Sequence, residues 1–245
     1  MPDLKCAICG KTIEGRFWVD GWGNRACVHH TVNMCFACHR IIGRYSTRSK
    51  KTGRIGFKVD NERVVCGLCQ ETCVNSTSVL KQAIDFAIDL LGKAGFKIVR
   101  EGITDVNVIT VEEMQQLAPG AEGLCRATLR SDPKLTTAKI WVLNGMPKIK
   151  LESVLAHEML HYWIFYNGID GGEQTEGFCN IGEALVLNYY ASQSKSLLAD
   201  HLRDSANNNP DYYYGIKFIE QKKKLQAMGW KNYIKDILET KKITP

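Results

Sequence analysis

The sequence lacks any apolar run long enough to cross a membrane, which takes about 20 consecutive apolar residues in a helix. Its opening residues, MPDLKC, lead from a charged start straight into Cys and do not form a signal peptide. Internal repeats and low-complexity segments are also missing, and hydrophobic residues make up 44% of the chain. These observations exclude a membrane protein, a repeat array and a disordered chain, and we expect a cytoplasmic globular protein.

A strong excess of charge of one sign is missing too. The formal net charge is only +6 in 245 residues. The basic residues concentrate in residues 44–54 and 222–224, and such runs are typical of solvated surface. We therefore do not expect nucleic acid as a partner.

Cysteine, in contrast, is plentiful before residue 70. Seven of the ten cysteines lie there, and six of them form Cys-x-x-Cys pairs. In a chain without a secretion signal, such pairs indicate zinc ligands before disulfides. Cys27-x-x-His30 is a fourth pair of the same spacing. Each pair lets one tight turn present two ligands to one ion, so four pairs build two structural zinc sites. In sequence order these sites are Cys6, Cys9, Cys27 and His30, and then Cys35, Cys38, Cys66 and Cys69.

Some of these assignments have alternatives. His29 could replace His30, Cys73 could compete with Cys69, and a cross-braced pairing fits the same count. The segments CAICGKTIEGRF and CFACHRII resemble the opening of a LIM domain and the start of its second zinc cluster. The chain departs from that pattern in having four residues between the clusters and Cys27 before His30. The resemblance implies a LIM-like double-zinc module that binds a protein partner.

The pattern of the chain divides it into three parts. Residues 1–75 hold the zinc module, and we expect a second domain at residues 96–245. Between them, residues 78–96 place apolar side chains on one face of a helix, and we expect this helix, at residues 76–95, to connect the two domains. In that domain residues 96–102, 105–110 and 138–145 predict strands. From residue 150 onward the pattern is helical, with breaks at 167–168, 171–172 and 207–210. The predicted fold class is α+β.

The second domain contains the motif His157-Glu158-Met159-Leu160-His161 inside an apolar helix, residues 154–166. A helix that is apolar nearly all round is a buried helix, and two imidazoles with a carboxylate are costly to bury without partners. Two histidines four residues apart lie on one helix face, where they can share a zinc ion. Glu158 lies beside them and can take a proton from zinc-bound water. The alternative is a satisfied structural pair of histidines.

A catalytic zinc needs a third protein ligand. The candidates are Asp170, Glu173, Glu176, Glu183 and His201, and Glu176 is favoured because it opens a second amphipathic helix that can return antiparallel to the first. The segment Glu176-Gly177-Phe178 also resembles the one that supplies the third ligand in gluzincin aminopeptidases. One turn further on, Asn180 is expected to support a ligand histidine.

Several segments together resemble the DA-one family, plant LIM-domain peptidases that limit organ growth and their bacterial relatives. They are KIWVLNGMPKIKLESVLAHEMLHYW, EGFC, YYGIKF and ILETKKITP, with CVHH, CFAC and CGLC upstream and GLC at 123–125. The resemblance runs from about Cys27 to Pro245. It implies that His157, His161 and Glu176 bind a catalytic zinc, that Glu158 is the general base, and that Tyr214, in a Tyr-Gly-x-x-Phe segment, contributes to catalysis.

We therefore expect a zincin-like metallopeptidase of the gluzincin type that holds three zinc ions and hydrolyses peptide bonds in a protein or peptide substrate. Tyr214 is expected to donate a hydrogen bond to the oxyanion, and residues 138–143 to be the edge strand that binds the substrate. The plant members carry acidic ubiquitin-interacting motifs ahead of the LIM region, which this sequence does not show, so ubiquitin regulation is not expected. The rival hypothesis is a LIM-type adaptor with an inactive peptidase domain.

Overall fold

A computed structural model describes residues 4–74 and 76–245, which divide into two compact units. Residues 1–3, where the segment excluded above as a signal peptide begins, and residue 75, the expected end of the first domain, lie outside the described residues. The first unit contains the chain up to residue 75 together with Asn144–Lys148, and the second contains Ser76–Leu143 and Ile149–Pro245. Within the described part of the chain, no helix is both long and apolar enough to span a membrane.

The first unit consists of two short hairpins and a one-turn helix. Strand β1 (Phe17–Val19) pairs antiparallel with β2 (Arg25–Cys27), and β3 (Gly56–Lys58) pairs antiparallel with β4 (Val64–Cys66). Helix α1 (Gly67–Gln70) follows β4 directly, and the sulfur of Cys66 accepts a hydrogen bond from the backbone N–H of Cys69. The expected cysteine pair at 66 and 69 thus spans the start of this helix.

The first unit also holds a segment that is distant in the sequence. The guanidinium of Arg63 is 6% exposed, pairs with Asp60, and donates to the backbone and side-chain oxygens of Asn144. The N–H of Val74 donates to Met146, and the N–H of Lys148 donates to Thr72. The loop that precedes the HExxH helix is therefore built into this cysteine-rich unit, which the sequence pattern does not indicate.

The second unit contains a three-stranded mixed sheet in the order β5-β7-β6. Strand β5 (Ile103–Ile109) pairs parallel with β7 (Thr137–Leu143), and β6 (Gly123–Thr128) pairs antiparallel with β7 on its other side. The prediction that residues 138–143 form the edge strand is therefore wrong. Strand β7 is central, and its buried residues Ala138, Ile140 and Val142 fit that position. The antiparallel edge is β6, which the sequence analysis did not predict as a strand.

Helix α2 (Thr77–Ala94) corresponds to the amphipathic helix expected as a connector. Ser76 caps its first turn by accepting from the N–H of Val79, and Gly95 ends it in the left-handed conformation. It belongs to the second unit, so residues 76–95 are part of that unit and not a separate connector. Residues 96–102, expected to be a strand, contain only a 3₁₀ turn at Arg100–Gly102. The short helix α3 (Val111–Leu117) lies between β5 and β6 and starts with a capping box at Thr110 and Glu113.

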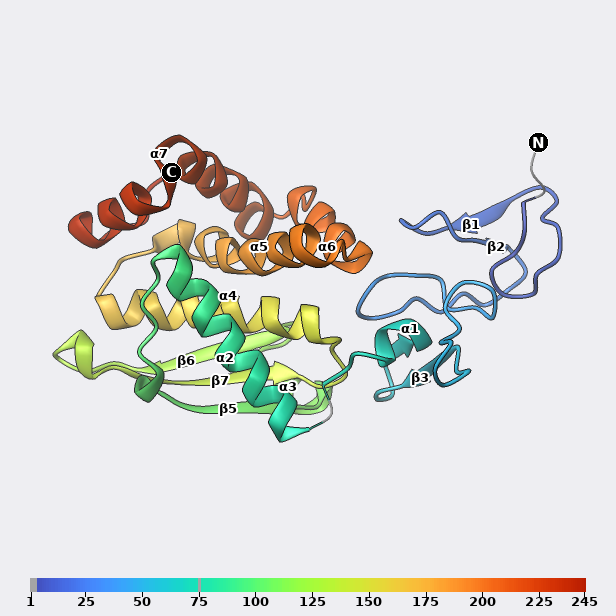
Figure 1. Cartoon of the computed structure of the whole chain (residues 1–245), viewed down its shortest axis with the longest axis horizontal. Coiled ribbons are helices and arrows are strands. Elements are labelled where there is room, and N and C mark those ends of the chain that lie inside the picture. Colours follow the sequence, from blue (N-terminus) through green and yellow to red (C-terminus); the bar gives the residue numbers. More distant parts are fainter. Residues whose placement is uncertain (1–3, 75) are drawn as a thin grey trace. The chain divides into compact units, whose positions relative to one another are not determined.

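Helices make up the rest of the second unit: α4 (Lys148–Asn167), α5 (Thr175–Ser194), α6 (Leu197–Asn207) and α7 (Lys217–Thr240). Figure 1 shows α4 between the sheet and the layer formed by α5, α6 and α7. Contacts between α4 and α5 pair His161 with Glu176 and Glu152 with Tyr190, so the two helices run antiparallel. Aromatic rings fill the interior beside them, with Phe96, Trp163 and Phe178 in mutual contact.

Candidate metal centre

Helix α4 carries the HExxH motif in the interior of the second unit. Of its twenty residues, fourteen are buried, including His157 and Glu158, which are 8% and 6% exposed. Buried polar side chains need partners, and helix α5 supplies them. The site is therefore built from the facing surfaces of two antiparallel helices.

Three ligand-type atoms from these helices converge on one point. The Nε2 atoms of His157 and His161 are 3.1 Å apart, and they lie 3.2 Å and 3.5 Å from Oε2 of Glu176. Ligand atoms at about 2.0–2.1 Å from a tetrahedral zinc ion are about 3.3 Å from one another. The spacing of these three atoms thus fits a shared ion, and the third residue is the glutamate that the sequence favoured.

The orientation of the His157 ring follows from its neighbours. Asn180 donates its side-chain N–H to the carbonyl oxygen of Tyr214 over 2.6 Å, which directs its Oδ1 toward Nδ1 of His157 at 2.8 Å. An amide oxygen only accepts, so Nδ1 carries the proton and Nε2 presents a lone pair. This is the tautomer that a metal ligand requires, and Asn180 is the partner that fixes it.

The surroundings of Glu176 keep its carboxyl group ionised. Burial by itself would raise the pKa of its carboxyl, but the close approach of His157 and His161 outweighs burial and holds the pKa of Glu176 well below its usual range. The carboxylate is therefore ionised at neutral pH, which is the form in which a carboxyl group binds zinc.

The carboxylate of Glu158 lies beside the edge strand β6. A Cβ added to Gly123 would lie 2.5 Å from Oε1 of Glu158, so the carboxylate packs where only a glycine fits. Burial raises the pKa of Glu158 above its usual value, while the backbone N–H of Cys125 works in the opposite direction. A carboxylate beside a metal centre with a raised pKa is suited to accept and return a proton.

Of three consecutive tyrosines, one reaches this centre. Residues Tyr212–Ile216 form a π-helical turn (η4), a feature that is frequent at functional sites. Tyr212 directs its hydroxyl to Glu173, and the ring of Tyr213 contacts Tyr212. The ring of Tyr214 instead stacks near His157 with 6.4 Å between centroids. Burial, followed by the nearby Glu176 and Glu158 carboxylates, raises the pKa of Tyr214 to about 12.

Cys179 is the residue of this site that the sequence analysis assigned no role. It is fully buried, and its sulfur forms a group with His157 and His161 in which the ligand atoms lie within 4.8 Å of one another. Burial by itself would lower the pKa of His161, but Cys179, together with Glu176 and Glu158, raises it well above the usual value. Cys179 stands three residues after Glu176, and this helical spacing was the signal available in the sequence.

The other candidates for a third ligand lie elsewhere. The backbone of Asp170 forms an isolated β-bridge with that of Lys242, and the Glu173 carboxylate accepts a hydrogen bond from the Tyr212 hydroxyl. Glu183 is on α5 beyond Asn180, and burial raises the pKa of its carboxyl. His201 is on α6, outside the candidate metal groups found among the described residues.

The first unit holds two further candidate metal groups, in sequence order and not cross-braced: Cys6, Cys9, Cys27 and His30, and Cys35, Cys38, Cys66 and Cys69. Sulfur ligands around one tetrahedral zinc are about 3.8 Å apart, and the sulfurs of Cys38 and Cys66 are 3.8 Å apart. In the described part of the chain Nε2 of His30 is buried without a hydrogen-bond partner, as suits a nitrogen that binds an ion. Cys73 directs its thiol to the carbonyls of Cys69 and Gly145 instead. The described residues thus contain three candidate metal-binding groups, the third being that of His157, His161 and Cys179, and all are consistent with zinc.

Comparisons with known proteins find two similarities. The family model DA1-like, described as Protein DA1, matches residues 103–211, which include the sheet, the HExxH helix and Glu176. Protein DA1-related 2 of Arabidopsis thaliana is 25% identical over 218 residues, which cover 72% of this chain. The chain spans 38% of the length of that relative. No solved structure matches. Over residues 103–211 the chain is therefore similar to the DA1-like family, and over most of its length it is distantly similar to Arabidopsis DA1-related 2.

Proposed function

We propose that this protein is a zinc-dependent peptidase with a zincin-like, gluzincin-type catalytic domain. The observation that carries the proposal is the convergence of His157, His161 and Glu176 at distances of 3.1–3.5 Å, with Glu158 beside them. When bound there, zinc polarises a carbonyl group and lowers the pKa of a water molecule. Similarity to the DA1-like family, whose plant members are peptidases, supports the same reaction.

In this proposal Glu158 moves the protons. Its carboxylate takes a proton from the attacking water and returns it to the amine of the leaving peptide. Burial, which raises the pKa of Glu158, brings its proton affinity closer to what both transfers need. The π-helical turn places the Tyr214 phenol beside the site, and a phenol with a pKa of about 12 stays protonated at pH 7. Tyr214 thus donates a hydrogen bond to the carbonyl oxygen as it gains negative charge.

Strand β6 is the element that would hold the substrate. In the described sheet it pairs only with β7, so its other edge has backbone groups available to an extended peptide. It runs next to Glu158 at Gly123, which would bring a paired peptide to the catalytic groups. This role replaces the one expected for residues 138–143.

The zinc module completes the proposal. We assign it two structural zinc ions, for a total of three per chain, and a role in binding a protein partner or the substrate. Closed sites built from thiolates hold zinc without leaving a position open for water, so this module is not expected to catalyse a reaction.

The test is to incubate the zinc-replete protein with a peptide library and to identify products by mass spectrometry. The matched control is Glu158→Gln, which keeps the shape of the side chain and removes its basicity. Products that appear with the natural protein and not with the control establish peptidase activity and its specificity. Identical spectra from both proteins would reject the proposal in favour of an adaptor with an inactive domain.

A further inference from the structure

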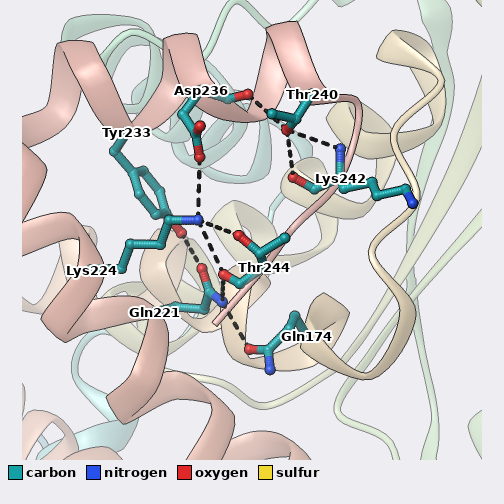
Figure 2. A network of polar contacts seen from close by, with 8 residues as sticks. All are labelled: Gln174, Gln221, Lys224, Tyr233, Asp236, Thr240, Lys242 and Thr244. Atoms are coloured by element: carbon teal, nitrogen blue, oxygen red, sulfur yellow. Dashed lines mark hydrogen bonds and ion pairs between the residues drawn. The ribbon is translucent and has the colours of Figure 1, made fainter.

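A network of buried polar side chains lies at the start of helix α5, immediately before Glu176. Its centre is Gln221 on α7, whose side chain is 0% exposed. Figure 2 shows Gln221 between Gln174, Tyr233 and the backbone of Thr244. The amide nitrogen of Gln221 donates to Gln174 Oε1 over 2.8 Å and to the Thr244 carbonyl over 2.9 Å, and its oxygen accepts from the Tyr233 hydroxyl over 2.8 Å. The hydrogen-bonding capacity of this amide is thus largely used.

The C-terminal segment, residues 241–245, folds back to join this network. Lys241 adopts a left-handed conformation that reverses the chain after α7. The N–H of Asp170 donates to the Lys241 carbonyl, and the N–H of Ile243 donates to the Asp170 carbonyl. Lys224 binds the backbone and hydroxyl oxygens of Thr244 and pairs with Asp236 (Figure 2). Backbone hydrogen bonds at Asp170 therefore attach the loop between α4 and α5 to the C-terminal segment.

Helix α7 contacts the first turn of α5 directly. A Cβ added to Gly177 would lie 2.3 Å from the backbone carbon of Lys217, so the two backbones approach as closely as only a glycine permits. Gln174, two residues before Glu176, also donates to Glu220 over 3.0 Å. The residues on either side of Glu176 are thus fixed to α7, one by hydrogen bonds and one by close packing.

Apolar packing alone would stabilise this region without fixing the position of α5 along its axis. Fully satisfied polar contacts in the interior accept one geometry, because a shift leaves buried groups unpaired. The carboxylate of Glu176 must lie within a few tenths of an ångström of its position for zinc to be shared with His157 and His161. The network lies at the start of α5, where a shift of this helix would change the distance from the Glu176 carboxylate to His157 and His161.

We propose that Gln174, Gln221 and residues 241–245 form a clamp that positions Glu176 as the third zinc ligand. The proposal rests on the proposed function, since it takes Glu176 to be a ligand of the catalytic zinc. Clamp residues do not touch the metal or the substrate and act only through Glu176. Losing such a supporting contact typically weakens metal binding by about 10- to 100-fold.

The test is a double-mutant cycle on the full chain, with zinc affinity at the His–Glu site measured by chelator competition. Gln174→Leu should weaken zinc binding by about 10- to 100-fold when Glu176 is present, and by less than about 3-fold in the Glu176→Ala background. Deletion of Thr244 and Pro245 should act in the same direction, because it removes the carbonyl that Gln221 binds.

Tyr190→Phe is the matched control, since it removes the hydrogen bond from Tyr190 to the buried Glu152 at the other end of α5. It should lower the melting temperature without weakening zinc binding. The clamp alone would be overturned if Gln174→Leu lowered the zinc affinity equally in both backgrounds. It would also be overturned if Gln174→Leu left the zinc affinity unchanged in both backgrounds while Glu176→Ala lowered it. Unchanged zinc binding in Glu176→Ala would overturn the ligand assignment and the clamp with it.

Discussion

Replacing Tyr214 with phenylalanine removes one hydroxyl group and leaves the ring in place. The ring stacks near His157, and the backbone carbonyl of Tyr214 accepts from Asn180, so neither the packing nor the orientation of His157 depends on the hydroxyl. We therefore expect zinc content and substrate affinity to stay nearly unchanged. The proposed hydrogen bond to the developing oxyanion is the one interaction of the reaction that is lost.

The size of the effect follows from the chemistry of the donor. The pKa of Tyr214, raised to about 12, keeps the phenol protonated throughout the neutral range, so the natural protein has a donor on nearly every molecule. Removing one oxyanion donor typically costs about 2.7–4 kcal/mol, which is about a 10²- to 10³-fold loss in kcat. Steady-state kinetics with a library-derived peptide would measure this loss at unchanged KM.

Tyr213→Phe is a closely matched control. Tyr213 and Tyr214 are adjacent and are 49% and 46% exposed, but the ring of Tyr213 contacts Tyr212, whereas the ring of Tyr214 stacks near His157. The control should keep the natural kcat. A Tyr214→Phe variant with near-normal turnover, or a loss as large in Tyr213→Phe, would refute the assignment of Tyr214 as the oxyanion donor.

Three further outcomes are expected. Glu158→Gln should abolish hydrolysis and keep all zinc, and loss of zinc from this variant in elemental analysis would speak against the role of Glu158 as a base. Because Glu158 must be ionised to accept a proton and burial raises its pKa, the activity of the natural protein should fall as the pH decreases. The midpoint of that fall should lie above the ordinary glutamate pKa of about 4.3. Glu176→Ala should weaken zinc at the catalytic site more than Cys179→Ser does, and the reverse order in chelator competition would make Cys179 the third ligand. Elemental analysis should find three zinc ions per chain, and two or fewer ions after zinc-replete expression would contradict this number. Mild chelation should remove the ion at His157 and His161 first, because closed thiolate sites hold zinc more tightly.

Local patterns in the sequence predicted well what depends on residues close together in the chain. The i, i+4 spacing in HExxH puts both histidines on one face of α4, because an α-helix repeats every 3.6 residues. The Cys-x-x-Cys pairs likewise predicted turns that present two sulfurs to one ion, and the structure groups them in the expected sequence order. The apolar face of residues 78–96 corresponds to α2, although the helix belongs to the second unit and does not connect two domains.

Predictions failed where the outcome depends on pairing between distant segments. Strand β6 has a weak alternation of apolar residues, and its place at the sheet edge follows from its antiparallel register with β7. The sequence contains no signal that orders three strands as β5-β7-β6, since strand order depends on which hydrophobic faces can be covered together. Residues 138–143 were accordingly placed at the wrong position in the sheet.

The sequence by itself determined the kinds of ligand, their local spacing and the helices that carry them. Only the tertiary structure decided that Glu176 meets both histidines, that Tyr214 and not Tyr212 or Tyr213 faces the site, and that Cys179 lies beside His161. It also decided that Gln221 joins Gln174 to the C-terminal segment. The physical reason is that spacing within one helix is set by backbone geometry, whereas the approach of two helices is set by the packing and hydrogen bonds of residues far apart in the chain.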